Sequence, residues 1–135
     1  MNSSSSIRLQ TGDALIAVDV QNDFLPGGSL AVPEGDAVVP VLNRYLAAFA
    51  ARALPVFATR DWHPPNHCSF KAQGGLATDY CVLNTVRDAL AEGFEVLLLA
   101  DAIRAVDLKA GDGARAQGEM QKLGARPIRY EDLAS

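Results

Sequence analysis

Short apolar runs alternate with longer amphipathic stretches along this chain. The short runs are rich in aliphatic residues and end in polar or turn-forming residues, which is typical of strands buried in a parallel sheet. The longer stretches repeat apolar residues at helical spacing, most clearly in Val38, Leu42, Tyr45, Leu46 and Phe49. The pattern predicts strands at Ala14–Val18, Val56–Thr59, Glu95–Leu99 and Arg126–Arg129, and helices at Asp36–Arg52, Val82–Glu92 and Asp112–Leu123.

The order of these elements predicts the fold class. Strands that alternate with helices form parallel sheets joined by right-handed crossovers. We therefore expect a three-layer α/β/α fold with a mostly parallel, doubly wound sheet and helices on both faces. The connection into the helix at Val82 is irregular, because residues 69–75 (SFKAQGG) are polar, glycine-rich and without a strand pattern.

Length and composition narrow the class of protein. The 135 residues, 49% of them hydrophobic, predict one globular domain spanning 1–135, with a loose polar N-terminus over 1–12. A net charge of −4 without a basic cluster argues against nucleic acid as a partner. No run approaches the ~20 apolar residues of a membrane span. The two cysteines, Cys68 and Cys81, form no disulfide framework, so we expect a reducing cytoplasm.

Cys81 is a candidate nucleophile because of its position at the start of a predicted helix. A thiol in the first helical turn faces unpaired backbone N–H groups and the positive end of the helix dipole, and both favour the thiolate. We therefore expect Cys81, and not the loop residue Cys68, to have a lowered pKa. The alternative is that Cys81 is a small buried apolar residue, as many free cysteines are.

Acidic residues follow two of the predicted strands. The first strand ends in Asp19, and the second leads into Asp61 and His63, where open α/β sheets build their sites. Asp61 and His63 are separated by one residue, so both side chains can reach one ion, and this donor pair suits Zn²⁺, Fe²⁺ or Mn²⁺. The alternatives are a capping role for Asp19 and a solvated loop for the pair. Asp23 is expected to hold its loop through backbone N–H groups.

Three segments together resemble a known family: DVQNDFLPGGSLAV, TRDWHPPNHCSF and LATDYCV. The chain is similar to the nicotinamidase branch of the isochorismatase-like cysteine hydrolases. The resemblance implies an enzyme of NAD salvage that converts nicotinamide to nicotinate and ammonia through a cysteine acyl-enzyme. It makes Cys81 the nucleophile and Asp19 the residue that takes the thiol proton. It also places the oxyanion against backbone N–H groups of Ala77 and Cys81, with a cis peptide at Leu76–Ala77.

The resemblance also implies a divalent metal ion that binds the pyridine nitrogen of the substrate and positions its ring. Asp61 and His63 are the implied ligands, joined in some family members by a histidine at the position of His67. Zn²⁺ is the first choice, with Fe²⁺ or Mn²⁺ as alternatives. Phe24 and Trp62 lie where the family stacks the substrate ring; the alternative for each is ordinary core packing, and a site role is favoured more for Trp62 than for Phe24.

One part of the family pattern is absent. The family carries several dozen residues between the equivalents of Gly75 and Leu76, including a metal-binding histidine, a catalytic lysine and a strand. None of Lys71, Lys109 and Lys122 stands at that lysine's position. We therefore expect an incomplete sheet, weak activity and a possible homo-oligomer. The alternatives are a metal-free hydrolase of isochorismate or a carbamoyl amide, and a truncated relative that binds without turnover.

Overall fold

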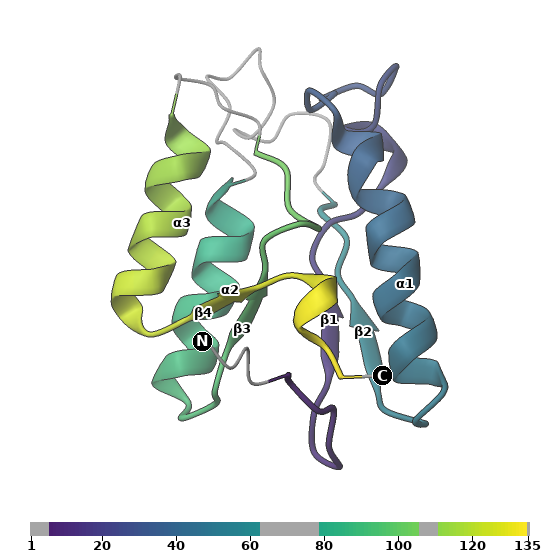
Figure 1. Ribbon diagram of the computed structural model, residues 1–135. Coiled ribbons are helices and arrows are strands. Elements are labelled where there is room, and N and C mark those ends of the chain that lie inside the picture. Colours follow the sequence, from purple (N-terminus) through teal and green to yellow (C-terminus); the bar gives the residue numbers. More distant parts are fainter. Residues whose placement is uncertain (1–5, 63–78, 106–110, 135) are drawn as a thin grey trace.

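The computed structural model describes residues 6–62, 79–105 and 111–134, which form two half-sheets flanked by helices (Figure 1). In the first, β1 (Leu15–Ala17) pairs in parallel with β2 (Val56–Ala58). In the second, β3 (Leu97–Leu99) pairs in parallel with β4 (Arg126–Ile128). All the predicted strands form, each shorter than the apolar run that predicted it.

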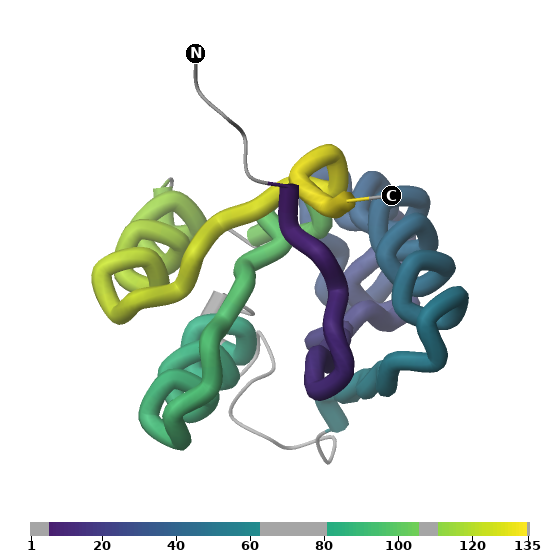
Figure 2. The backbone as a smooth tube through the Cα atoms, turned by 60° about the horizontal axis from the view of Figure 1, so that its bottom comes forward, coloured from purple at the N-terminus to yellow at the C-terminus, as the bar shows by residue number. Residues whose placement is uncertain are grey.

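Helices cover both sides of these strands. The helix α1 (Val38–Ala50) lies on one side, and α2 (Asp79–Ala91) and α3 (Asp112–Leu123) lie together on the other, as Figures 1 and 2 show from two directions. Short 3-10 turns at Asn22–Phe24, Gly35–Ala37 and Tyr130–Asp132 complete the described elements. The α/β fold with parallel strands is confirmed.

The sheet is divided rather than continuous. Leu15 is paired with Val56 and Leu97 with Arg126, but within the described residues no strand joins β1 to β3. The apolar pattern predicts which residues form strands, whereas pairing requires a neighbour at about 4.8 Å. The expected incompleteness of the sheet therefore takes the form of a break in its middle.

The predicted apolar stripe of α1 faces β1. Val38, Tyr45 and Phe49 are buried, and Tyr45 and Phe49 form a cluster with Leu15 of β1. The helix itself starts at Val38 instead of Asp36, because the preceding residues form a 3-10 turn entered through Glu34 at a φ of 54°.

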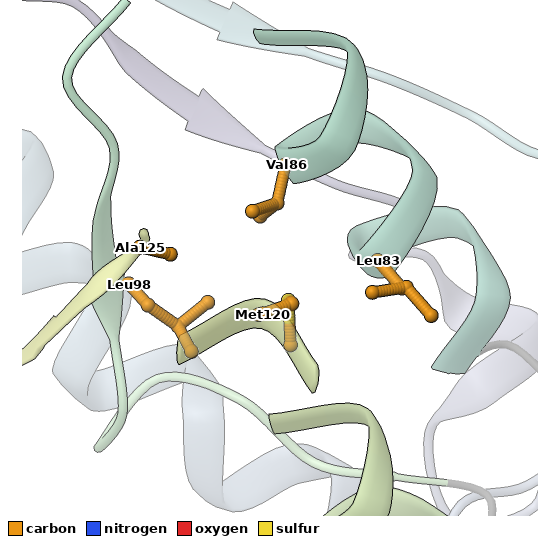
Figure 3. Close-up of a cluster of buried hydrophobic side chains, with 5 residues drawn as sticks. All are labelled: Leu83, Val86, Leu98, Met120 and Ala125. Atoms are coloured by element: carbon orange, nitrogen blue, oxygen red, sulfur yellow. The ribbon is translucent and has the colours of Figure 1, made fainter. Parts of the chain in front are cut away.

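A second cluster lies beneath α2 and α3. Its buried members come from both helices, from β3 and from the residue before β4, and Figure 3 shows them pointing toward one another: Leu83, Val86, Leu98, Met120 and Ala125. The helix α3 has the predicted bounds, whereas α2 extends to Asp79, three residues before the expected start at Val82.

Asp101, just after β3, ties the two halves together. Its Oδ1 accepts a hydrogen bond of 2.9 Å from the hydroxyl of the fully buried Tyr45, and its Oδ2 accepts one of 2.9 Å from the backbone N–H of Tyr130. The rings of Tyr45 and Tyr130 also meet edge to face at 5.1 Å. Burial, followed by the hydrogen bond to Asp101 and its charge, raises the pKa of Tyr45.

The described part of the N-terminal segment is held in place, unlike the loose terminus expected over 1–12. The Ile7 N–H donates to the carbonyl of Asp132, and the Ala134 N–H donates to the carbonyl of Ile7, each at 2.7 Å. Leu9 packs against the cluster around Tyr45. No helix among the described residues is long and apolar enough to cross a membrane.

We expect Tyr45→Phe to lower the free energy of unfolding by about 1.5–3 kcal/mol, because it removes a hydrogen bond to a charged, part-buried carboxylate. Tyr130→Phe is the matched control, since the bond from residue 130 to Asp101 comes from the backbone and survives the change. Urea unfolding of both variants measures the difference. Equal losses of stability would show that the Tyr45 hydroxyl does not join the halves.

Candidate active site

Cys81 and Asp19 come from different halves of the molecule and meet at the carboxyl ends of β1 and β2. Asp19 lies just after β1, Thr59 follows β2, and Cys81 occupies the first turn of α2. The Asp19 carboxylate lies close enough to the Cys81 thiol for its hydrogen bonding and its charge to raise the pKa of the thiol. The structure thus brings together the thiol and the carboxylate that the sequence predicts to react with each other.

Thr59 fixes the conformation of Asp19. The Thr59 hydroxyl donates to Asp19 Oδ1 at 2.6 Å, and its oxygen accepts from the Asp19 backbone N–H at 3.1 Å. Asp19 has a φ of 54°, in the left-handed region that aspartate tolerates better than most residues. Sequence reasoning missed Thr59, although its place at the end of the neighbouring strand is a signal that could have indicated it.

The pKa of Cys81 is raised to about 12, so the predicted lowering is wrong. Burial is the largest cause, followed by the hydrogen bond to Asp19 and the negative charges of Asp19 and Asp61. Cys81 lies in the first turn of α2, as predicted. Burial and the two carboxylates raise the pKa of its thiol by more than the helix N-terminus lowers it. At neutral pH this site therefore holds a thiol beside a carboxylate, and a thiolate forms only when its proton is taken.

Asp23 organises the loop after β1 mainly through side-chain hydrogen bonds, and its own backbone N–H makes a smaller contribution. Its carboxylate accepts from Ser29 Oγ at 2.8 Å and from Gln21 Nε2 at 3.1 Å. These two hydrogen bonds, Ser29 first, hold the pKa of Asp23 below its usual value.

Gln21 links this loop to the segment after β2. Its Oε1 accepts from the Asp61 backbone N–H at 2.9 Å, and its Nε2 donates to the Asp61 carbonyl at 3.3 Å. Gln21 was not among the predicted site residues, because no local pattern marks a contact between segments so far apart in sequence.

The two aromatic candidates differ in burial. Phe24 is 7% exposed, as a core residue is, whereas Trp62 is 76% exposed and has the Arg60 guanidinium over its ring at 4.5 Å. A groove of about 780 Å³ is lined by Phe24, Asp19 and Cys81 among others, so a ligand beside the thiol would have Phe24 as part of its surroundings.

Several predicted site residues lie outside the described part of the chain: His63, His67, Ala77, and the Leu76–Ala77 peptide. Among the residues that the structure describes, no three histidine, cysteine or acidic side chains gather closely enough to hold a metal ion. Asp61 is the one predicted ligand within the described residues, and its charge acts on Cys81.

Comparisons with known proteins agree with this arrangement. The model of the Isochorismatase domain matches residues 13–74 and 74–132. A nicotinamidase of Escherichia coli K12 is 30% identical over 196 residues, an alignment that covers 83% of this chain and 92% of that protein.

Solved structures give the same relationship. A pyrazinamidase of Pyrococcus horikoshii in complex with zinc superposes with a TM-score of 0.77 at 32% identity, covering 87% of this chain and 98% of that one. PnC1 from L. infantum in complex with nicotinate superposes with a TM-score of 0.76 at 25% identity, covering 98% of this chain and 96% of that one.

The family model matches this chain in two segments that meet at residue 74. The alignment with the E. coli relative spans 196 residues and is therefore longer than this 135-residue chain. The E. coli relative therefore contains residues that have no counterpart here. On both sides of residue 74 the match is to the same domain. The chain belongs to the isochorismatase family, in the branch of the nicotinamidases and pyrazinamidases.

Proposed function

We propose that this protein is a cysteine amidohydrolase that converts nicotinamide to nicotinate and ammonia. The observation that carries the proposal is that the Cys81 thiol and the Asp19 carboxylate line one groove of about 780 Å³, close enough for the carboxylate to raise the pKa of the thiol. The relatives named nicotinamidase and pyrazinamidase, and the relative in complex with nicotinate, support a pyridine or pyrazine carboxamide as substrate.

In the first half-reaction, Cys81 Sγ attacks the amide carbon as Asp19 takes the thiol proton. The negative charge on the carbonyl oxygen faces the backbone N–H of Cys81 and that of Ala77, the latter outside the described residues. Asp19 then returns the proton to the nitrogen, the C–N bond breaks, and ammonia leaves a thioester on Cys81.

In the second half-reaction, water attacks the thioester carbon and Asp19 takes a proton from it. The C–S bond breaks, the proton returns from Asp19 to Sγ, and nicotinic acid leaves and ionises to nicotinate by giving its remaining proton to water. Asp19 thus acts in both halves, and the two hydrogen bonds that it shares with Thr59 keep its carboxylate oriented. Because the pKa of Cys81 is raised to about 12, proton transfer and attack have to be coupled.

Asp61, His63 and His67 are the residues that would hold a divalent ion, with Zn²⁺ favoured by the zinc complex of the Pyrococcus horikoshii relative. A carboxylate with two imidazoles is a donor set that zinc accepts. When bound, the ion would attach the substrate through its ring nitrogen. Phe24 in the groove wall and Trp62 after β2 would then contact the substrate ring.

The break between β1 and β3 favours a second candidate, a relative that binds the amide without efficient turnover. A reacting group is effective only when its supporting elements hold it within about half an ångström. Here the thiol and the carboxylate belong to half-sheets that no described strand connects.

We expect slow ammonia release from nicotinamide and pyrazinamide by the chain as given. The family's lysine has no counterpart here, and losing one such contact typically costs ~10²–10³ in rate. Cys81→Ala should abolish the remaining activity, whereas Cys68→Ala, the matched control, should leave it unchanged. An ammonia assay with both variants checks this. Activity that persists in Cys81→Ala would contradict the proposed nucleophile, and no ammonia release from the unaltered chain would favour the second candidate.

We expect iodoacetamide to label Cys81 slowly at pH 8 and faster as the pH rises toward about 12. Asp19→Asn removes one of the negative charges, so it should lower the pKa and increase the labelling rate about tenfold per pKa unit. Asp23→Asn, in the same loop, is the matched control. Peptide mass spectrometry measures the rates. Slower labelling in Asp19→Asn would instead mean that the carboxylate already activates the thiol in the resting enzyme.

We expect zinc to bind with an affinity that depends on His63. Equilibrium dialysis should show about tenfold weaker binding or more in His63→Ala, because a ligand with a direct metal bond is lost. Asp36→Ala, an exposed acidic residue in the turn before α1, is the control for unspecific attraction. Unchanged binding in His63→Ala would remove His63 from the ligand set.

A further inference from the structure

The strand β1 directs backbone groups away from its partner. The N–H of Leu15 bonds the carbonyl of Pro55 at 3.0 Å, and the carbonyl of Ala17 accepts from Thr59 at 2.9 Å. Residues alternate in the direction of their backbone groups along a strand, so Ile16, between these two, points its N–H and C=O to the opposite edge. No hydrogen bond occupies either group among the described residues.

The strand β3 does the same from the other half-sheet. The carbonyl of Val96 accepts from Arg126, and the N–H of Ala100 donates to Ile128, each at 2.9 Å. Because the direction alternates from residue to residue, Val96, Leu98 and Ala100 face β4. Leu97 therefore directs its N–H and C=O away from β4. Its backbone groups also have no hydrogen-bond partner in the part of the chain that the structure describes.

The groove of about 780 Å³ runs along both of these edges. Its walls are mostly apolar and include Ile16, Val18, Val86, Leu97 and Leu99. Ile16 is 45% exposed, although strands of parallel sheets are usually buried on both faces. The groove therefore combines apolar walls with the unpaired backbone groups of Ile16 on one side and Leu97 on the other.

We propose that this groove binds one extended, apolar and uncharged peptide segment as a β-strand parallel to β1 and β3. Such a strand would bond Ile16 on one side and Leu97 on the other, turning two half-sheets into one. Two observations favour a strand over a small molecule: the two unpaired strand edges that face the groove, and the division of the family match at residue 74, where a relative carries additional residues.

A separate peptide fits better than a second copy of this chain. The strands β2 and β4 of a second copy are each already paired on one edge, so either could pair with only one further strand. A strand between β1 and β3 needs both of its edges free. Its length would be about five residues, the usual length of a strand.

The experiment uses the whole chain and a synthetic peptide of about five valine and isoleucine residues, flanked at each end by uncharged serine residues for solubility. We expect binding that slows amide hydrogen exchange at Ile16 and Leu97, followed by NMR. A peptide with proline at its centre lacks an N–H for the ladder and should not bind. Equal protection by both peptides would overturn the proposal.

Two variants distinguish binding in the groove from nonspecific hydrophobic binding elsewhere on the surface. Ile16→Asp places a charge in the groove and should weaken binding of the valine–isoleucine peptide roughly tenfold or more. Leu123→Asp changes a residue that is 44% exposed, close to the 45% of Ile16, but lies outside the groove, and should have no effect. Equal effects of the two variants, or protection of Ile16 by dimerisation of the chain alone, would contradict a peptide-binding groove. None of these readouts depends on hydrolysis.

Discussion

The geometry of the site depends on how the two half-sheets are held together. Asp19 belongs to the half formed by β1, β2 and α1, whereas Cys81 belongs to the half formed by β3, β4, α2 and α3. Among the described residues, the halves are joined by the Asp101 carboxylate, which bonds the Tyr45 hydroxyl and the Tyr130 backbone, and by the apolar cluster around Tyr45. This contact is distant from the thiol in sequence, yet it joins the two halves that carry the thiol and Asp19.

The electrostatics of the thiol follow from the same arrangement. A helix N-terminus typically stabilises a negative charge by about 0.3–1 kcal/mol, less than one pKa unit. Burial and the carboxylates of Asp19 and Asp61 act in the opposite direction and raise the pKa of Cys81 to about 12. The site therefore favours a protonated thiol with its base already in contact. The carboxylate that disfavours the thiolate at rest is the group that accepts its proton during reaction.

The apolar pattern predicted the helices, the strands and the buried face of α1, because each depends on residues close together in sequence. Asp19 and Cys81 could be proposed as partners because strand ends and helix starts meet at one edge of a parallel sheet. The contacts of Gln21 with Asp61 and Tyr45 with Asp101 join segments 40 or more residues apart, and no local signal marks them. The predicted lowering of the Cys81 pKa was wrong for the same reason, because the shift depends on residues that only folding brings next to the thiol.

The most direct test of this account is an NMR titration of the protein with ¹³C-labelled cysteine, following the Cβ of Cys81 as the pH rises. A half-buried thiol beside the Asp19 carboxylate should titrate with a midpoint near 12. A midpoint at or below the ordinary thiol value of about 8.5 would show that Asp19 and Cys81 are not in contact in the folded protein. That result would contradict the central claim, because the paired thiol and carboxylate would not exist.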